Sequence, residues 1–310
     1  MIIEKIHKQL VSSRLLLCVI ILAFIVLRLY PLEDNWDNLL LWSSLSLQIG
    51  IAFFLLYLNH KFSIIQGYTL LPAFFYLLFV GINPVFSDEL KGSIAALCFI
   101  LCYYFLFDSY QNPESQVNAL NISLLLVLGS LLWTPLLFFF PLFWIGFRQF
   151  QCFNTRVFFS SLTGFIIVYL FIFTYSVFKG EKDIILYLLP QLDSMFFFQK
   201  PDLPLIDWIT CGLLLLTYFI IGIYLFLFDI SERLWTITTL RYFYLSSFFI
   251  FIFFLLQTGY KSTWGLISYI PLAFLCGHSF SSSNKRIIQY SFILFIVFLI
   301  VIGVAHKINL

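Results

Sequence analysis

The segment from Asn121 to Phe147 reads NISLLLVLGSLLWTPLLFFFPLFWIGF and carries no charged residue. A straight helix over this segment would be about 40 Å long, whereas the hydrocarbon core of a bilayer is about 30 Å thick. Thr134-Pro135 lies near its middle, and proline removes a backbone donor and disfavours a helical residue before it. The segment is therefore either one long kinked span or, with its flanks from Val117 to Phe150, two short spans joined by a tight turn.

The amino-acid composition indicates whether water or lipid surrounds the folded chain. The chain has 310 residues, of which 62% are hydrophobic and 10% are charged. Soluble domains carry about 25% charged residues, and no soluble core takes up so much apolar surface. Most of the chain therefore requires lipid around it. The apolar runs are continuous rather than alternating, which disfavours a membrane β-barrel. We expect an all-α protein, a polytopic bundle of transmembrane helices.

The apolar runs predict about 11 spans (10–12). Several are nearer 15 residues than the roughly 20 that cross a bilayer, and these are interpreted as tilted partners, half-helices or wrongly bounded spans. The first run has no cleavage-like site after it and is interpreted as an uncleaved span. Together the spans form a single integral membrane domain over residues 1–310. They are expected at Leu15–Leu27, Leu39–Asn59, Phe62–Ile82, Gly92–Phe107, Val117–Trp133, Pro135–Phe150, Val157–Phe178, Ile206–Phe228, Tyr242–Leu256, Trp264–Cys276 and Ile288–Val304.

The distribution of Lys and Arg favours the central hairpin narrowly. With two short spans in the central segment and a cytoplasmic N-terminus, the cytoplasmic loops hold more Lys and Arg than the outer loops. With a single span, every later loop changes sides and the excess shrinks. The positive-inside rule therefore indicates the hairpin.

One outer segment is expected to lie along the membrane. Asp183 to Gln199 reads DIILYLLPQLDSMFFFQ and is interrupted by Pro190. It is too short and broken to span, so it is interpreted as an interfacial or re-entrant helix. Such a helix either caps the bundle or forms a lid over an external site.

The densest polar cluster lies in two early loops that open on the same outer side. The first loop carries Arg28 and three acids, and the second carries two acids and Lys91; the five acids are Glu33, Asp34, Asp37, Asp88 and Glu89. Their oxygens are the ligands that Mg²⁺, Mn²⁺ or Ca²⁺ prefer. One carboxylate would act as a general base while Arg28 meets a lipid phosphate. Alternatively, these acids only solvate the outer surface.

Other classes of function are disfavoured. The net charge of +2 is spread over the loops, without the basic block that nucleic-acid binding requires. No ionisable residue lies in the middle of a span, which disfavours a proton-coupled pump or antiporter.

The acidic first loop, the passage LPAFFYLLFVGINPVFSDELKGSIAALCFILCYYFLF and the run GSLLWTPLLFFFPLFWIGF together resemble the membrane module of C-type glycosyltransferases, over about residues 15–175. These enzymes use polyprenyl-phosphate sugars and often a divalent metal. The resemblance implies that Asp34 or Asp37 is the catalytic acid and that Asp88 and Glu89 bind Mg²⁺ or Mn²⁺. Arg28, Glu33 and Lys91 would then bind the lipid-linked sugar.

The run PLFWIGFRQFQCFNTRVFFSSLTGF resembles an uncharacterised family of bacterial polytopic inner-membrane proteins. This resemblance implies a multi-pass protein of the inner membrane with a cytoplasmic N-terminus, and it implies no activity. We therefore expect a scaffold or subunit in the assembly of cell-envelope lipids or glycans, with membrane lipids and other envelope proteins as partners. The alternatives are a glycosyltransferase-like enzyme at the external face and a transporter or lipid flippase. Whether the chain is an enzyme stays open at this point.

Overall fold

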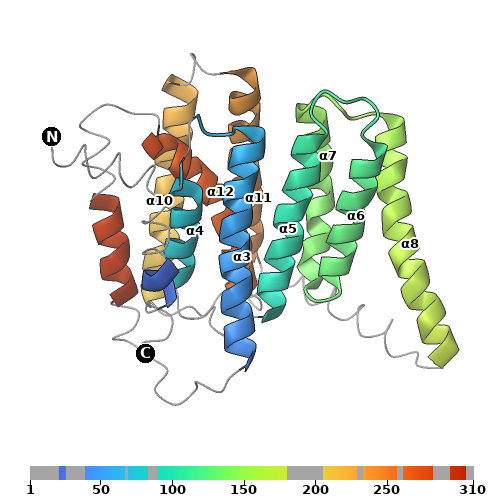
Figure 1. The fold of residues 1–310 in the computed structure, drawn as a ribbon, viewed down its shortest axis with the longest axis horizontal. Helices are drawn as coiled ribbons and strands as arrows, with labels where there is room; N and C mark the ends of the chain where they lie inside the picture. The colour runs from blue at the N-terminus through green and yellow to red at the C-terminus, as the bar shows by residue number, and fades with distance from the viewer. Residues whose placement is uncertain are drawn as a thin grey trace. The chain divides into compact units, whose positions relative to one another are not determined.

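The computed structural model describes residues 21–25, 39–66, 69–82, 90–179, 205–228, 233–256, 261–281 and 294–304. Every regular element in these ranges is a helix (Figure 1), so the all-α prediction is confirmed for them. Short helices cover residues 21–25 and 294–304. The longer elements are α3 (Leu39–Phe62), α4 (Leu71–Ile82), α5 (Leu90–Asp108), α6 (Gln116–Ser130), the 3-10 helix η2 (Thr134–Phe139), α7 (Phe140–Gln149), α8 (Thr155–Lys179), α10 (Leu205–Phe228), α11 (Leu234–Leu256) and α12 (Lys261–Ser281).

Four of the described helices are long and apolar enough to cross a membrane. They are Leu39–Phe62, Leu90–Asp108, Thr155–Lys179 and Leu234–Phe254. Shorter apolar helices include Leu71–Ile82, Gln116–Ser130 and Leu294–Val304. These helices are consistent with a membrane protein, while the full number of spans stays a prediction.

The central segment is broken where proline enters it. α6 ends at Ser130, the chain turns at residues 131–133, and η2 begins at Thr134 with Pro135 in its first turn. Trp133 is extended, with φ −145° and ψ 93°. Gly129 lets the chain fold back, because a Cβ there would meet the side chains of Leu136 and Cys98. α6 has 15 residues, or about 22 Å of helix, so whether α6 and α7 each cross a membrane stays a prediction.

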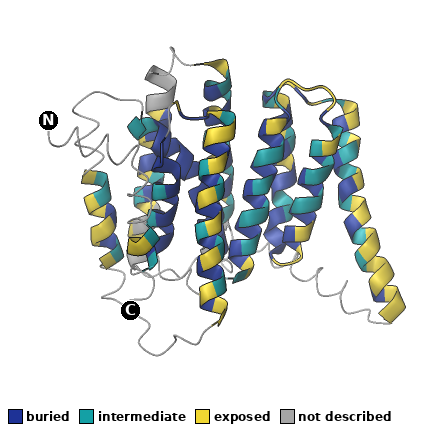
Figure 2. Cartoon of the chain, viewed as in Figure 1, coloured by how far each residue is buried: buried dark blue, intermediate teal, exposed yellow. Residues whose placement is uncertain are grey.

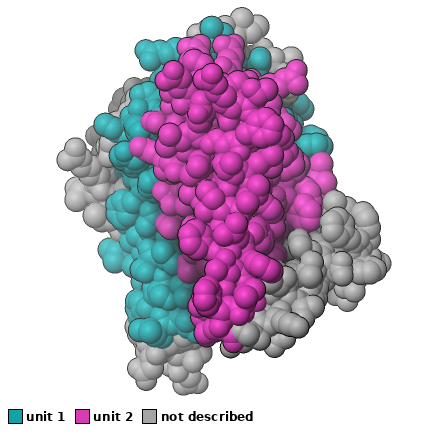
Figure 3. Space-filling view, turned by 90° about the vertical axis from the view of Figure 1, so that its right-hand side faces the viewer, with its two compact units in different colours: residues 1–90, 202–248, 268–310 teal, residues 91–201, 249–267 magenta. Residues whose placement is uncertain are grey.

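The contacts divide the chain into two compact units, coloured separately in Figure 3. Unit 1 comprises residues 1–90, 202–248 and 268–310, and unit 2 comprises residues 91–201 and 249–267. The single membrane domain over residues 1–310 stays a prediction.

In unit 2, helices α5 to α8 form two helical hairpins that pack against each other. α5 and α6 are antiparallel: Asn118 Nδ2 donates to Ser109 Oγ (3.0 Å) at one end, and Gly129 lies against Cys98 at the other. α8 lies beside α6 and runs parallel to it, with Ser160 Oγ donating to the Gln116 carbonyl (2.6 Å).

An aromatic ladder joins α5 to α7. Phe99 meets Phe139 with ring centroids 4.8 Å apart, Tyr103 meets Phe143 at 6.1 Å, and Phe107 meets Phe150 at 5.7 Å. The pairs advance together along both helices, so α5 and α7 run parallel. Since α5 and α6 are antiparallel, α7 also runs opposite to α6. The loops 109–115 and 150–154 consequently lie at the same end of unit 2.

In unit 1, α3 and α4 are separated by a turn where the sequence predicts a span from Phe62 to Ile82. α3 continues to Phe62, Ser63 adopts a left-handed conformation (φ 49°), and α4 begins only at Leu71. Asn59 fixes this turn, since its Oδ1 accepts a hydrogen bond from the Ile65 amide (2.9 Å). Pro72 follows in the first turn of α4, a position that tolerates the missing amide hydrogen.

The remaining helices of unit 1 pack through aromatic rings. Tyr218 of α10 stacks on Tyr244 of α11, with ring centroids 4.2 Å apart, and Gly222 leaves the room that the Tyr244 ring occupies. Phe243 of α11 stacks on Phe274 of α12 at 4.7 Å. Trp235 Nε1 donates to the Phe62 carbonyl (2.8 Å) and ties the start of α11 to the end of α3.

Reporter fusions test the sidedness of unit 2. Because the Gln111 amide donates to the Phe150 carbonyl (3.1 Å), the two loops at this end must face the same compartment. We expect fusions at Gln111 and Gln151 both to report a cytoplasmic location, measured by paired alkaline phosphatase and fluorescent-protein reporters. A fusion at Lys91, at the other end of α5, should report the outer side. Opposite sides for Gln111 and Gln151 would contradict the hairpin.

Candidate functional site

Most of the residues that the sequence predicts for a catalytic site lie outside the described residues. These are Arg28, Glu33, Asp34, Asp37, Asp88 and Glu89, and the expected interfacial segment Asp183–Gln199 lies outside them too. Lys91 is described and is exposed in the first turn of α5. The catalytic acids, the lipid-linked sugar site and the Mg²⁺ or Mn²⁺ site therefore stay predictions. Within the described ranges, no group of three or more His, Cys, Asp or Glu residues is placed to hold a metal ion.

Several hydroxyl groups within the apolar helices bond to the backbone of their own helix. Ser130 Oγ donates to the Val127 carbonyl (2.6 Å), and Ser247 Oγ donates to the Phe243 carbonyl (2.9 Å). Thr163 Oγ1 does the same with the Ser160 carbonyl (2.7 Å). These hydroxyls are satisfied within one helix turn, which is how hydroxyl residues are accommodated in apolar helices.

The two loops at one end of unit 2 are tied into a single rigid cap. Asn154 makes two of the bonds: its Oδ1 accepts from the Val157 amide (2.8 Å) and caps α8, and its Nδ2 donates to the Pro113 carbonyl (2.7 Å) of the other loop. Gln111 and Gln151 adopt left-handed conformations, with φ 54° and 60°. The cap fixes where α6 and α8 begin and therefore how they pack.

Cys152 is buried in this cap. Its thiol donates to the Phe147 carbonyl (3.3 Å). Burial raises the pKa of this thiol from its usual 9.0 to about 11, and the Ser115 hydroxyl and the backbone amide of Cys152 limit the rise. The thiol is therefore protonated at neutral pH, which makes it structural rather than reactive.

Small residues bring α6 and α8 into close contact. Val157, Ser161, Gly164 and Val168 form the buried face of α8. A Cβ on Gly164 would overlap Ser123 Oγ and come within 3.0 Å of the Leu120 carbonyl. Small residues are typical of helix contacts in membranes because they allow backbones to approach. We call this contact the α6–α8 seam.

The opposite face of α8 is exposed. Only 22% of its apolar segment is buried, against 56% in α5, and Figure 2 shows that exposed residues dominate the C-terminal half of α8. Phe171 is 70% exposed and Phe178 is 86% exposed. A row of exposed residues, spaced alternately four and three positions apart, runs along this face: Phe159, Thr163, Ile166, Leu170, Phe173 and Val177. We call this row the outer face of α8. Its spacing is that of knobs-into-holes helix contacts.

Comparison with protein-family models gives no match, and comparisons with curated proteins and with solved structures give none either. The candidate site therefore rests on the geometry of the chain alone.

Sequence reasoning missed the α6–α8 seam and the cap. The signal for the seam is present, since Ala119 and Ser123 of α6, and Ser160 and Gly164 of α8, are each spaced four residues apart. No comparable signal marks Gln111 and Gln151, because glutamine has no preference for left-handed backbone.

Replacing Gly164 tests the seam. We expect Gly164→Ala to destabilise the protein by about 1–3 kcal/mol, as overpacking does, because the Leu120 carbonyl belongs to a helix backbone and cannot move aside. Thermal unfolding in detergent measures the effect. Gly50→Ala in α3 is the matched control, since a Cβ there meets nothing within 4 Å. Equal melting temperatures for the two variants would show that the seam is not tight.

Alkylation tests the state of Cys152. At pH 7.5, the raised pKa lowers the thiolate fraction about 100-fold relative to an exposed thiol, and we expect maleimide to label Cys152 only after unfolding, as measured by peptide mass spectrometry. Because the pKa is raised in the folded state, the stability linked to this proton is complete below about pH 9 and is lost as the pH rises through about 11. Cys152→Ser should lack this alkaline loss, and rapid labelling of the folded protein at pH 7.5 would contradict the assignment.

Proposed function

We propose that the protein is a scaffold or partner subunit of the bacterial inner membrane that acts in the assembly of envelope lipids or glycans. In this proposal, the outer face of α8 binds a transmembrane helix of the partner protein. The observation that carries this proposal is the bare apolar face on a helix whose other face is held tightly by the α6–α8 seam.

Because α8 is held rigidly, its outer face is suited to binding a partner helix. The cap fixes the start of α8, and the seam fixes its rotation, so the exposed side chains are presented in one arrangement. A preorganised surface binds more tightly, because less conformational entropy is lost on binding. Ile166, Leu170 and Phe173 are each 57% exposed and supply the bulk that fills the holes of a facing helix.

Truncation of the outer face tests the proposal. We expect the triple variant Ile166→Ala, Leu170→Ala, Phe173→Ala to lose at least about 90% of the partner that co-purifies in stoichiometric amount, because each truncated anchor contributes of the order of 1 kcal/mol or more. Quantitative mass spectrometry of the purified complex measures the loss. A photoreactive amino acid at Leu170 should crosslink to the same partner.

The control is a triple truncation on α10, Leu216→Ala, Phe219→Ala and Ile223→Ala, at positions of matched exposure (57%, 58% and 59%). This variant should retain the partner. Equal loss in both variants would show that the effect concerns lipid contact in general. If the purified chain alone transfers sugar from a lipid-linked donor and Asp34→Asn abolishes that transfer, the scaffold proposal is wrong.

A further inference from the structure

Arg156 lies at one end of the outer face of α8. The row of exposed residues on this face begins at Phe159, and Arg156 stands three positions before it and is exposed too. The alternating spacing of four and three therefore extends to Arg156, which places this cation on the same side of the helix as the apolar row. α8 begins at Thr155, so Arg156 lies in its first turn, at the cap. The outer face thus combines an apolar row with one positive charge at its cap end.

This charge lies where the helix itself disfavours it. The N-terminal end of a helix carries a partial positive charge, so an acidic residue there is stabilising and a basic residue is not. The first turn of α8 contains Arg156 and no acidic residue. Arg156 and Glu114, which belongs to the other loop of the cap, are both exposed, so the guanidinium stays open to a group from outside the chain. A carboxylate supplied there by a partner would be stabilised by the guanidinium and by the helix end together.

The apolar row of the outer face is built mainly of large side chains. Ile166, Leu170 and Phe173 follow one another along it, and each is 57% exposed. Large side chains on one helix need holes on the facing helix, and in membranes small residues such as Gly, Ala, Ser and Thr provide the space. We therefore expect small residues on the facing helix at the positions that meet this row.

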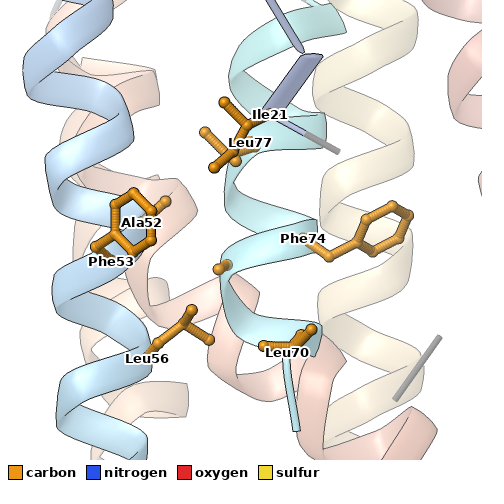
Figure 4. A pocket seen from close by; sticks show the side chains of 8 residues that line it. Ile21, Ala52, Phe53, Leu56, Leu70, Phe74 and Leu77 are labelled. Atoms are coloured by element: carbon orange, nitrogen blue, oxygen red, sulfur yellow. The ribbon is translucent and has the colours of Figure 1, made fainter. Parts of the chain in front are cut away.

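Two close helix contacts within the described residues follow the same rule. In unit 2, Gly164 and Ser123 are small residues of the α6–α8 seam. In unit 1, Ala52 of α3 and Ala73 of α4 line the space that these two helices leave between them (Figure 4). Its volume of about 10 Å³ is that of about one water molecule, so α3 and α4 pack closely there. The row on the outer face of α8 has only Thr163 as a residue of this kind, so the partner must supply the others.

A second copy of the chain fits this face poorly. Two copies in one membrane have the same orientation, so a symmetric dimer through α8 would set the two helices parallel, with each residue near its own counterpart. Arg156 would then face Arg156, and Leu170 would face Leu170. Like charges repel, and two rows of large side chains hold the helix backbones apart. A helix of a different protein therefore fits this face better.

We propose that the partner of the outer face of α8 is a transmembrane helix of a different protein, with a row of small residues opposite Ile166, Leu170 and Phe173 and a carboxylate opposite Arg156. This inference rests on the proposed function, which places a partner helix on this face, and adds the chemistry of that helix. The apolar row sets how closely the two helices approach, and the ion pair at the cap end fixes their register.

Designed single-span peptides test this chemistry. The full chain, fused to a fluorescent protein as the donor, and a peptide with an acceptor dye are placed in phosphatidylcholine vesicles, and energy transfer measures the binding constant. One peptide carries a row of Gly at alternating spacings of four and three, and a Glu at the end that lies level with the cap. We expect it to bind about tenfold more tightly than a peptide with Leu in place of Gly. It should bind about threefold more tightly than a peptide with Gln in place of Glu.

Exchange of the charges tests the ion pair. Arg156→Glu should remove the preference for Glu over Gln, and a peptide with Lys at that position should then bind best. A lipid phosphate cannot produce this exchange, so the exchange separates a partner carboxylate from a lipid headgroup. The matched control is Arg148→Glu, which changes another exposed basic residue at the cap end, on α7 and outside the row, and should leave the preference unchanged.

The results that contradict this inference differ from those that contradict the proposed function. Equal binding of the Gly and Leu peptides, or a preference for Glu that persists in Arg156→Glu, would overturn the inference and leave the proposed function intact. Energy transfer between two copies of the chain that is lost on truncation of Ile166, Leu170 and Phe173 would make a second copy the partner and overturn the inference as well. The proposed function itself fails if this triple truncation retains the co-purifying partner.

Discussion

Unit 2 depends on one constraint, the break in the helix at Trp133 to Pro135. Proline has no backbone N–H to donate, so α6 cannot continue through Pro135. The chain leaves α6 through Trp133, whose backbone is extended. Gly129 has no side chain and so leaves space for Leu136 to pack against α6, which completes the reversal of the chain direction. Without this break, α7 would not run opposite to α6, the two loops would not meet, and α8 would have no cap from which to start.

The α6–α8 seam follows from that reversal. The cap sets where α6 and α8 begin, so Gly164 falls opposite Ser123 and not against a larger side chain. The Ser123 and Thr163 hydroxyls bond within their own helices, and α8 turns its bulky side chains outward. In water, such a surface would be strongly unfavourable, whereas in a membrane its cost is small and shape decides what it binds. The seam and the bare face therefore belong to one arrangement.

The sequence predicts the helices better than their ends. Composition and continuous apolar runs indicate an all-α chain, and α5, α8 and α10 lie close to their expected ranges. α4 is shorter than expected because Asn59 and Ser63 form a turn that hydropathy does not detect. α11 begins earlier than expected, at Leu234, because Arg241 is exposed on the helix and its long side chain can keep the charge in water.

The candidate sites are harder to predict, since they depend on which residues meet. The small residues of the seam are visible in the sequence, yet nothing there pairs Ser123 with Gly164. Carboxylates, by contrast, are easily noticed in an apolar sequence, so the early acidic loops lead to the prediction of a catalytic and metal site. Whether these carboxylates form such a site depends on the distances between them.

The aromatic ladder between α5 and α7 determines where the chain can change length during evolution. Successive rungs depend on both helices keeping the same register, and each residue of a helix turns its side chain by about 100° from the last. Deleting one residue within α7 would therefore rotate every later ring away from its partner at once. A residue added outside these two helices would leave the rungs as they are. Natural variation in length should accordingly fall outside α5 and α7, which evolve by substitution alone.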